Sequence, residues 1–325
     1  MSSIEMIRAA AGRAKGHVRK TPLLSSPFLD EVAGRRVFVK AECLQHTGSF
    51  KFRGGWSALS GLSRAARAAG VLAYSSGNHA QGVALAARLH GVPATIIMPA
   101  DAPPLKISNT KAYGAEVILY DRAGGASREE VGAHMQAARG LTLIRPYDEP
   151  LVIAGQGTCG LEIAAQLAAL GVTSGEMLTC CGGGGLTAGI ALALAEQAPE
   201  IRVRPVEPVG FDDTVRSLVS GRIERNTGPE SGYWDAILTP SPGQQTFPIL
   251  QSLCGPGLVV TEAETRAAIR LAFERLKLVA EPGGAVALAA ALFHGTELKG
   301  DAVGVTLSGG NVDRTAFATV LAEAN

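Results

Sequence analysis

Lys51 is the residue of this chain best placed to do covalent chemistry. It lies between Phe50 and Phe52, directly after a strand-like run at residues 37–42. The pKa of an exposed lysine is about 10.4, so its amine is protonated at neutral pH. Two phenylalanines that desolvate the amine, with Arg53 beside it, should lower that pKa. Such an amine can form a Schiff base with an aldehyde, although the segment alone fits an ordinary surface lysine at a helix start equally well.

A run of four glycines provides a candidate phosphate site. Residues 181–187 read Cys-Gly-Gly-Gly-Gly-Leu-Thr and connect an apolar run at 177–180 to a helical run at 188–197. Free backbone N–H groups and the positive end of the helix dipole bind phosphate without any Lys or Arg. A mobile turn explains the glycines less well, because glycine costs backbone entropy. Position 187 is threonine, so the segment does not match the G-x-G-x-x-G dinucleotide fingerprint.

Two more strand-to-helix turns carry polar side chains. Ser308 opens the Ser-Gly-Gly-Asn segment after a strand-like run at 302–307. Ligands of open α/β sheets bind at this edge of the strands, where a hydroxyl could bond the nitrogen of a heterocycle. Residues 75–81 read Ser-Ser-Gly-Asn-His-Ala-Gln, and the serines, Asn78 and the helix N-terminus would suit a carboxylate. Taken singly, each segment is equally well described as a common turn or helix cap.

Composition and charge exclude several classes of protein. The 325 residues are 46% hydrophobic and 18% charged, which suits a large core, and the net charge of +1 argues against a nucleic-acid partner. We expect no membrane segment, because no apolar run reaches spanning length and the charged N-terminus does not resemble a signal peptide. The five cysteines contain no C-x-x-C pair, so we expect a reduced, cytoplasmic protein.

Strand-like and helical runs alternate along the chain. In the middle third we predict strands at 71–76, 94–99, 116–120 and 141–146, and helices at 78–90, 105–113 and 127–138. Later strands are predicted at 177–181, 202–207 and 302–307, with helices at 160–170, 186–197, 214–220, 262–276 and 314–324. This alternation is typical of parallel sheets with crossovers. It predicts a small domain, 70–147, inserted into a large domain formed by 1–69 and 148–325, which includes a long loop at 226–245.

The order of these motifs, with Ala-Gly-Gln-Gly-Thr at 154–158, resembles the pyridoxal-phosphate enzymes of fold type II, the tryptophan synthase beta-like fold. The resemblance is strongest to the threonine/serine dehydratase and serine racemase branch, and it extends from Arg19 to the C-terminal helix. A cysteine-synthase relative would instead read Thr-Ser-Gly-Asn-Thr-Gly at the segment that begins at Ser75. The resemblance implies an α/β protein of two open parallel-sheet domains with the cofactor between them.

The resemblance also implies roles for the matching residues. Lys51 would form the Schiff base with pyridoxal 5'-phosphate (PLP) and act as base on one ring face, with Phe50 stacked near the ring. Asn78 would bond the 3-oxygen of the ring and Ser308 its nitrogen. The phosphate would be held by the backbone N–H groups of Gly182, Gly183, Gly184, Gly185 and Leu186. The substrate carboxylate would be held or approached by Ser76, Asn78, His79 and Gln156, and Ser76 would be the acid and base on the opposite ring face.

The family further implies a divalent-cation site at 207–213. The side chains of Glu207 and Asp213, the carbonyl of Phe211 and water would form an oxygen shell that suits Mg²⁺ or Ca²⁺. Without the resemblance, the same residues read as a strand end followed by an acidic helix start. The cation would be structural, because the segment lies away from Lys51.

The reaction implied is the removal of water from L-threonine or L-serine, which gives a 2-oxo acid and ammonia, by a homodimer. A 3-hydroxyaspartate dehydratase or a serine racemase would share these motifs. Tyr147 stands where serine racemase has an asparagine, which favours a dehydratase. Arg53, Arg145 and Arg216 are candidates for binding a second substrate carboxylate. Two alternatives from other classes are a nucleotide-binding oxidoreductase and a non-catalytic amino-acid sensor.

Overall fold

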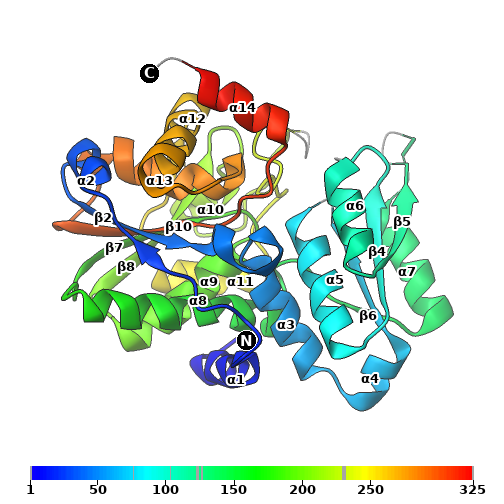
Figure 1. Ribbon diagram of the computed structural model, residues 1–325. Coiled ribbons are helices and arrows are strands. Elements are labelled where there is room, and N and C mark those ends of the chain that lie inside the picture. The colour runs from blue at the N-terminus through cyan, green and yellow to red at the C-terminus, as the bar shows by residue number, and fades with distance from the viewer. Residues whose placement is uncertain are drawn as a thin grey trace.

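The chain forms two predominantly parallel β-sheets that lie side by side, each with helices packed on it (Figure 1). The computed structural model describes residues 2–75, 77–102, 104–121, 124–125, 127–228 and 232–323. The larger sheet has the strand order β1-β2-β10-β7-β8-β9, and the smaller sheet has the order β5-β4-β3-β6. Short β1 runs antiparallel to β2, and the other strand pairs in the described part of the chain are parallel. The predicted α/β fold with two parallel sheets is confirmed.

The strands are short, and most are buried on both faces. The large sheet consists of β1 (Leu23–Leu24), β2 (Arg36–Ala41), β7 (Gly175–Cys180), β8 (Ile201–Pro208), β9 (Leu258–Val260) and β10 (Ala302–Leu307). The small sheet consists of β3 (Val71–Tyr74), β4 (Ala94–Pro99), β5 (Glu116–Tyr120) and β6 (Thr142–Leu143). All residues of β4 and β10 are buried, as expected for parallel strands with helices on both sides.

The helices of the large sheet form two layers. Figure 1 shows α2 (Pro27–Ala33), α12 (Glu262–Leu271), α13 (Pro282–Phe293) and α14 (Arg314–Ala322) on one side of the sheet. The other side carries α1 (Ile4–Ala14), α8 (Pro150–Ala169), α9 (Gly185–Gln197) and α11 (Thr246–Leu253). Helix α13 is apolar around its whole circumference and is buried from Gly283 to Leu292. Such a helix has no polar face, and we did not predict it from the sequence.

Helix α3 (Lys51–Gly61) joins the two parts of the molecule. Its residues Phe52, Trp56 and Leu59 belong to one apolar cluster with Val71 and Ile96 of the small sheet. The remaining helices of this part are α4 (Arg64–Ala69), α5 (Asn78–His90), α6 (Pro104–Ala112) and α7 (Arg128–Arg139). The helix that begins at Lys51 is therefore part of the core of the small sheet, although residues 1–69 were assigned to the large domain. The domain boundary itself stays a prediction.

The two ends of the chain meet in the large sheet. Strand β10 lies between β2 and β7, with Thr306 opposite Lys40 and Val303 opposite Glu176. The small sheet is thus inserted between β2 and β7 in the sequence, and the last strand completes the large sheet. This connection places the ends of β2, β7 and β10 beside one another at a single sheet edge.

The predicted start of α8 is wrong. The helix begins at Pro150, ten residues before the predicted start at residue 160, and so includes Gly155 and Gly157, which the prediction left outside the helix. A Cβ atom on Gly155 would lie 2.4 Å from the carbonyl oxygen of Arg53, and one on Gly157 would lie 2.9 Å from that of Gly189. These glycines allow neighbouring helices to approach closely. Strand β6 is shorter than predicted, whereas the described residues of the 226–245 loop contain no helix or strand, as expected.

Helix α8 also corrects the expectation that no segment reaches membrane-spanning length. By length and composition it could cross a membrane, and it is the one such helix among the described residues. Two-thirds of its apolar window is buried inside the protein. Its apolar surface is explained by packing against α3 and α9, which occupy the positions that lipid would otherwise fill.

Candidate active site

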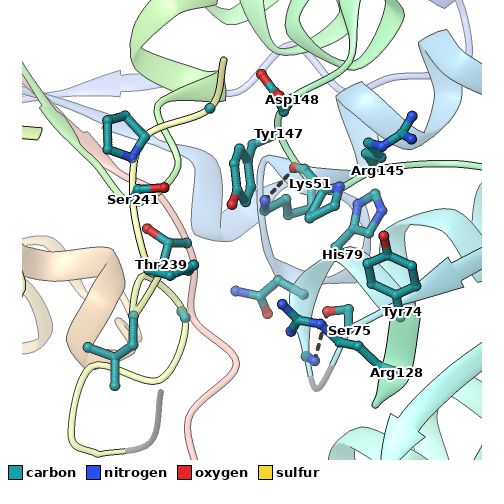
Figure 2. A pocket seen from close by; sticks show the side chains of 18 of the residues that line it. Lys51, Tyr74, Ser75, His79, Arg128, Arg145, Tyr147, Asp148, Thr239 and Ser241 are labelled. Atoms are coloured by element: carbon teal, nitrogen blue, oxygen red, sulfur yellow. Dashed lines mark hydrogen bonds between the residues drawn. The ribbon is translucent and has the colours of Figure 1, made fainter. Parts of the chain in front are cut away.

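Lys51 begins α3 directly after a tight turn in which Thr47 and Gly48 have positive φ angles of 59° and 72°. Its Nζ atom donates a hydrogen bond to the carbonyl oxygen of Pro146 (2.8 Å; Figure 2). The same atom lies 5.2 Å from the centre of the Phe50 ring. Burial lowers the pKa of Lys51 to about 8, against the opposing charge of Glu281. A substantial fraction of the amine is therefore neutral near pH 8.

The predicted reason for this low pKa is partly wrong. Phe50 lies beside the amine, but Arg53 does not contribute to the shift. Residues two positions apart lie roughly 200° apart around a helix, so Arg53 points away from Lys51. Its guanidinium binds Glu42 and Glu162 on the other side of α3.

The four-glycine run connects β7 to α9 as predicted. Gly184 is in the left-handed region (φ 88°), and α9 begins at Gly185. A Cβ atom on Gly183 would lie 2.2 Å from the Tyr147 ring, and one on Gly185 would lie 2.7 Å from Gln156 Oε1. A helix leaves its first N–H groups without intrahelical acceptors. The loop therefore presents free backbone donors and the positive end of α9 at a place where only glycine fits.

Ser308 and Asn78 complete an inner cavity around Lys51. Ser308 directly follows β10, and its carbonyl oxygen accepts a hydrogen bond from the backbone N–H of Phe50 (3.2 Å). The Nδ2 atom of Asn78 donates to Glu281 Oε1 (2.5 Å), which leaves its second N–H available. All predicted cofactor residues line this one cavity: Phe50, Lys51, Asn78, Gly182, Gly183, Gly184, Gly185, Leu186 and Ser308.

Gln156 faces the inner cavity from α8. Both polar atoms of its side chain are buried without a hydrogen-bond partner in the protein. An unpaired buried amide costs free energy, about 1–3 kcal/mol for each group, so a polar group of a ligand is expected to bond it. We predicted Gln156 near the substrate carboxylate, and its position in the inner cavity brings it closer to the cofactor residues.

An outer cavity of about 440 Å³ opens from the inner one and shares Lys51, Asn78 and Tyr147 with it (Figure 2). Ser75, Gly77 and the N-terminus of α5 form part of its wall, which is the predicted place for a carboxylate. Ser76 lies outside the residues that the structure describes. Most of the charged side chains that line the cavity are cationic: Lys51, Lys106, Arg128, Arg145 and Arg225, against Glu129, Asp148 and Asp235.

His79 lies in the wall of the outer cavity as a neutral side chain. Its Nε2 atom lies 2.9 Å from the carbonyl oxygen of Ile144 and must carry the proton, because the carbonyl can only accept. Burial and the charge of Lys51 lower the pKa of His79 to about 3. Its buried Nδ1 atom has no partner. His79 can therefore accept a hydrogen bond but cannot supply a positive charge at neutral pH.

Comparison with known proteins identifies the family. The family model described as "pyridoxal-phosphate dependent enzyme" matches residues 14–309. The chain belongs to this family. It is 43% identical to L-threo-3-hydroxyaspartate ammonia-lyase of Pseudomonas sp over 99% of both chains, and 40% identical to serine racemase of Schizosaccharomyces pombe over 98% of this chain and 96% of that one. The crystal structure of a threonine deaminase from T.th. matches with a TM-score of 0.89 and 47% identity, covering 96% of this chain and 99% of that one.

These relatives confirm the predicted membership in the fold type II PLP enzymes, dehydratase and racemase branch. Three site residues of this PLP enzyme were missed from the sequence. Lys106 and Arg128 reach the outer cavity from α6 and α7. Thr246 supports the glycine run: its Oγ1 atom donates to the carbonyl oxygen of Gly183 (2.7 Å) and accepts from the backbone N–H of Gly243 (2.9 Å). No local motif marks them, because only the tertiary fold brings them to the site.

Of the three arginines considered for a second carboxylate, only Arg145 lines the outer cavity of the PLP enzyme. Arg53 is bound within a buried ion-pair cluster. Arg216 contacts Asn226 and Asp212 on the surface of the large domain. The structure thus removes two of the three candidates.

The predicted cation ligands lie together at the end of β8 and the start of α10 (Asp213–Ser220). Glu207 accepts hydrogen bonds from the backbone N–H groups of Thr214 (3.2 Å) and Val215 (2.8 Å). The Oδ2 atom of Asp213 is buried without a partner. Burial and the charge of Asp213 raise the pKa of Glu207 well above its usual value, and burial raises the pKa of Asp213 to about 7.

Two adjacent buried carboxylates are unfavourable. The charge of Arg216 offsets this only in part, since the pKa of Asp213 is still raised, and a bound cation would relieve it. Among the described residues, no group of three or more His, Cys, Asp or Glu side chains forms a metal site. The predicted site requires only two carboxylates and a carbonyl oxygen. The donor set is made entirely of oxygen, which fits Mg²⁺ or Ca²⁺.

Proposed function

We propose that this chain is a PLP-dependent ammonia-lyase that removes water from a β-hydroxy amino acid and releases a 2-oxo acid and ammonia. The observation that carries this proposal is the position of Lys51. Its amine, with a pKa of about 8, lies where the inner cavity, lined by the glycine run, meets the outer cavity, lined by polar and charged side chains. Three relatives with ammonia-lyase, deaminase or racemase activity in their names support the same reaction class.

The residues of the inner cavity fit PLP. The N–H groups of the glycine run would hold the phosphate, Ser308 the ring nitrogen and Asn78 the 3-oxygen, and the unpaired amide of Gln156 offers one further donor and acceptor. A Cβ atom at Gly183 or Gly185 would collide with its neighbours, so the cradle depends on backbone groups. When bound, PLP supplies an electron sink for the charge that develops at the substrate Cα atom.

The side chains of the protein supply binding and proton transfer. Lys51 can take the Cα proton, because a base with a pKa near the working pH is most effective. The substrate carboxylate is proposed to lie at the N-terminus of α5, where the first backbone N–H groups of the helix, from Asn78 onward, favour an anion; the N–H of Gly77 is donated to Ser75 Oγ (3.1 Å). His79 stays neutral there and offers an acceptor at Nδ1. Holding substrate and base together lowers the barrier through orientation.

The experiment that tests this proposal uses Lys51→Ala. Wild-type protein loaded with PLP and reduced with borohydride should carry the cofactor covalently on the peptide that contains Lys51, as mass spectrometry would show. The Lys51→Ala protein should lose this adduct and the release of 2-oxo acid. A wild-type protein that remains unlabelled at Lys51, or a variant that keeps full turnover, would refute the proposal.

Among the β-hydroxy amino acids, we propose 3-hydroxyaspartate as the best substrate, with L-threonine and L-serine as weaker ones. Arg128 and Arg145 line the outer cavity, beyond what one α-carboxylate requires. Lys106 lines the same wall but is paired with Asp235 (2.5 Å). Arg128 is held by Glu129 and by the face of the Tyr74 ring. The ammonia-lyase of Pseudomonas sp is named for L-threo-3-hydroxyaspartate.

A comparison of substrates tests this preference. Arg128→Gln and Arg145→Gln should each lower kcat/KM for 3-hydroxyaspartate more than for L-threonine. Loss of a charge-assisted hydrogen bond, about 1.5–3 kcal/mol, corresponds to roughly 10- to 100-fold. Arg64→Gln makes the same charge change at an exposed residue of α4 and should leave kcat/KM unchanged for both substrates. Equal losses for both substrates in the Arg128 and Arg145 variants would contradict a second-carboxylate site.

Serine racemase activity is the second candidate function, supported by the relative from Schizosaccharomyces pombe. It requires an acid and base on the ring face opposite Lys51, the role proposed for Ser76. Ser76→Ala should then reduce the formation of D-serine from L-serine more than the formation of pyruvate. If both products fall equally, Ser76 does not act on the opposite face.

We also propose that Glu207, Asp213 and the carbonyl oxygen of Phe211 bind Mg²⁺ or Ca²⁺. The unpaired Oδ2 atom of Asp213 and the two neighbouring buried carboxylates support this site. Either ion should raise the thermal midpoint of the wild-type protein and not that of Glu207→Gln. Glu176→Gln is the matched control, because Glu176 is also buried but is paired with Arg204. An equal response of wild type and Glu207→Gln would exclude the site.

A cytoplasmic location and a homodimer complete the proposal. The five cysteines are free, which agrees with a reducing compartment. The exposed apolar residues Phe28, Val32, Phe273 and Phe293 lie on the α2–α13 side of the large domain, which agrees with an interface between two copies. Sedimentation or light scattering that gives the mass of a single chain would contradict the dimer.

A further inference from the structure

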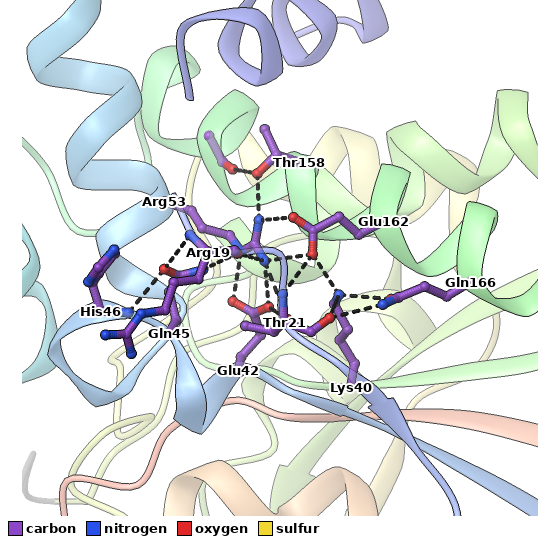
Figure 3. A network of polar contacts seen from close by, with 11 residues as sticks. Arg19, Thr21, Lys40, Glu42, Gln45, His46, Arg53, Thr158, Glu162 and Gln166 are labelled. Carbon is purple, nitrogen blue, oxygen red and sulfur yellow. Dashed lines mark hydrogen bonds and ion pairs between the residues drawn. The ribbon is translucent and has the colours of Figure 1, made fainter. Parts of the chain in front are cut away.

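Arg53 follows Lys51 by two residues in α3 and lies at the centre of a largely buried cluster of charges, which Figure 3 shows. Its side chain is 1% exposed, and each of its five N–H groups has an acceptor. Nε and Nη2 donate to both oxygens of Glu42 (2.7 and 2.8 Å), and Nη1 and Nη2 donate to both oxygens of Glu162 (2.7 and 2.9 Å). The fifth N–H is donated to Thr158 Oγ1 (3.1 Å).

Lys40 balances the charge of this cluster. Its buried Nζ atom donates to Glu162 Oε2 (2.6 Å), to Gln166 Oε1 (2.9 Å) and to the carbonyl oxygen of Thr21 (2.8 Å). The cluster thus contains two cations and two carboxylates, and every ammonium and guanidinium proton is used. Burial alone would raise the pKa of Glu42, but the charge and hydrogen bonds of Arg53 hold it below its usual value.

The cluster joins the elements that surround the inner cavity. Lys40 belongs to β2, Glu42 follows that strand, Arg53 lies in the first turn of α3, and Glu162 lies in α8. Helices α3 and α8 touch at Gly155, where a Cβ atom would lie 2.4 Å from the carbonyl oxygen of Arg53. One helix carries Lys51 and the other carries Gln156, which borders the glycine run. The relative position of α3 and α8 therefore sets the distance from Lys51 to the phosphate cradle.

A stabilising role alone does not account for the cluster. Burying Lys40, Glu42 and Arg53 beside the partly exposed Glu162 costs desolvation energy, and well-packed apolar residues often give equal or greater stability. The best-attested advantage of buried ion pairs is that they fix one register between elements. The bidentate geometry of Arg53 on both carboxylates is of this kind, because a shift of α3 along α8 would break several bonds at once.

We propose that Arg53 is a positioning residue that locks α3 against α8 and so holds the Lys51 amine at the correct distance from the phosphate cradle. This inference rests on the proposed binding of PLP at Lys51 and extends it to a residue that touches neither cofactor nor substrate. Lysine at position 53 would keep the charge but could not bind two carboxylates in bidentate fashion. The planar guanidinium group of Arg53 is therefore required to fix α3 against α8, and a positive charge alone is insufficient.

The test measures two quantities: the equilibrium binding of PLP, and the pH dependence of the reaction of Lys51 with an amine reagent in cofactor-free protein. Arg53→Lys should weaken the equilibrium binding of PLP by about tenfold or more, which corresponds to about 1.4 kcal/mol. The pH midpoint of the Lys51 reaction with an amine reagent should also move from about 8. Glu162→Gln keeps an oxygen acceptor for Arg53 at a partly exposed position, so it should weaken PLP binding in the same direction but by a smaller factor. This second variant keeps the test valid if Arg53→Lys does not fold.

Arg204→Lys is the matched control. Arg204 forms another buried arginine–glutamate pair, with Glu176 (3.1 Å), and both side chains are 6% exposed. Glu176 is the second residue of β7, whereas the site lies beyond the end of that strand, so the control should lower the thermal midpoint and leave PLP affinity unchanged. If the Arg53, Glu162 and Arg204 variants all bind PLP as wild type does, positioning by Arg53 is refuted. Failure of wild type itself to bind PLP at Lys51 would instead refute the proposed function.

Discussion

Replacing Gly82 with alanine should disturb the site from a helix that does not carry the lysine. Gly82 lies in α5 where this helix crosses the start of α3. A Cβ atom there would lie 2.9 Å from the carbonyl carbon of Lys51, 3.0 Å from its oxygen and 3.0 Å from the nitrogen of Phe52. All three atoms are backbone, so no side chain can rotate away. Reaching an ordinary contact of 3.4 Å requires a movement of about 0.5 Å between the helices.

The expected effects can be estimated from this geometry. Overpacking of a core costs about 1–3 kcal/mol, and the higher helix propensity of alanine returns about 1 kcal/mol. The net loss of stability should be about 0–2 kcal/mol, or a few degrees in the thermal midpoint. A displacement of 1 Å at a reacting group costs about 100-fold in rate. Half of that displacement should therefore lower kcat on the order of tenfold.

Gly132→Ala provides the comparison for this variant. Gly132 is a buried glycine of α7, and a Cβ atom there would make ordinary contacts of 3.5–3.6 Å with Tyr74, Ile97 and Leu72. It should raise the thermal midpoint slightly, through the same propensity gain of about 1 kcal/mol, and leave kcat unchanged. The assay is kcat for 2-oxo acid formation together with thermal unfolding of both variants. If Gly82→Ala keeps wild-type kcat and stability, the close contact does not position Lys51.

Two further predictions concern the cofactor cavity. The rate at which cofactor-free protein forms its covalent link with PLP should rise with pH and level off above about pH 8. The reason is that the pKa of Lys51 is lowered to about 8 and only the neutral amine reacts. A rate, followed by stopped-flow absorbance, that does not change between about pH 7 and pH 9 would contradict this. Thr246→Val should weaken PLP binding and cost about 0.5–1.5 kcal/mol for each hydrogen bond lost. The carbonyl of Gly183 and the N–H of Gly243 each lose the threonine hydroxyl and keep their 3.2 Å bond to one another. Thr110→Val, at a buried helical hydroxyl of α6, should leave PLP affinity unchanged.

The sequence was sufficient where local chemistry fixes local structure. A glycine run between a strand and a helix predicted the cradle at 182–185, and the alternation of elements predicted both parallel sheets. Helix α5 and strands β4, β5 and β10 have the predicted bounds. Lys51, Asn78 and Ser308 were expected at strand ends, and the structure places them around one cavity because parallel strands end at a common edge.

The sequence failed where glycine serves packing and where distant segments meet. Nothing in the sequence indicates that Gly155 and Gly157 lie inside a helix. In the structure they allow the backbones of α3 and α9 to approach α8 closely. Arg53 is adjacent to Lys51 in sequence, yet the helix directs it to the opposite side. Arg128 and Thr246 carry no local signal, because only the tertiary fold brings Arg128 to the outer cavity and Thr246 to the carbonyl oxygen of Gly183.

The place of β10 in the large sheet has a consequence for biosynthesis. Strand β2 leaves the ribosome early, but its central neighbour follows roughly 270 residues later, which takes on the order of tens of seconds at ordinary translation rates. The strands of the small sheet are consecutive in sequence and can pair during this interval. One edge of β2 meanwhile stays open to wrong partners. A nascent chain stalled before β10 should therefore depend on chaperones in a way that a completed chain does not.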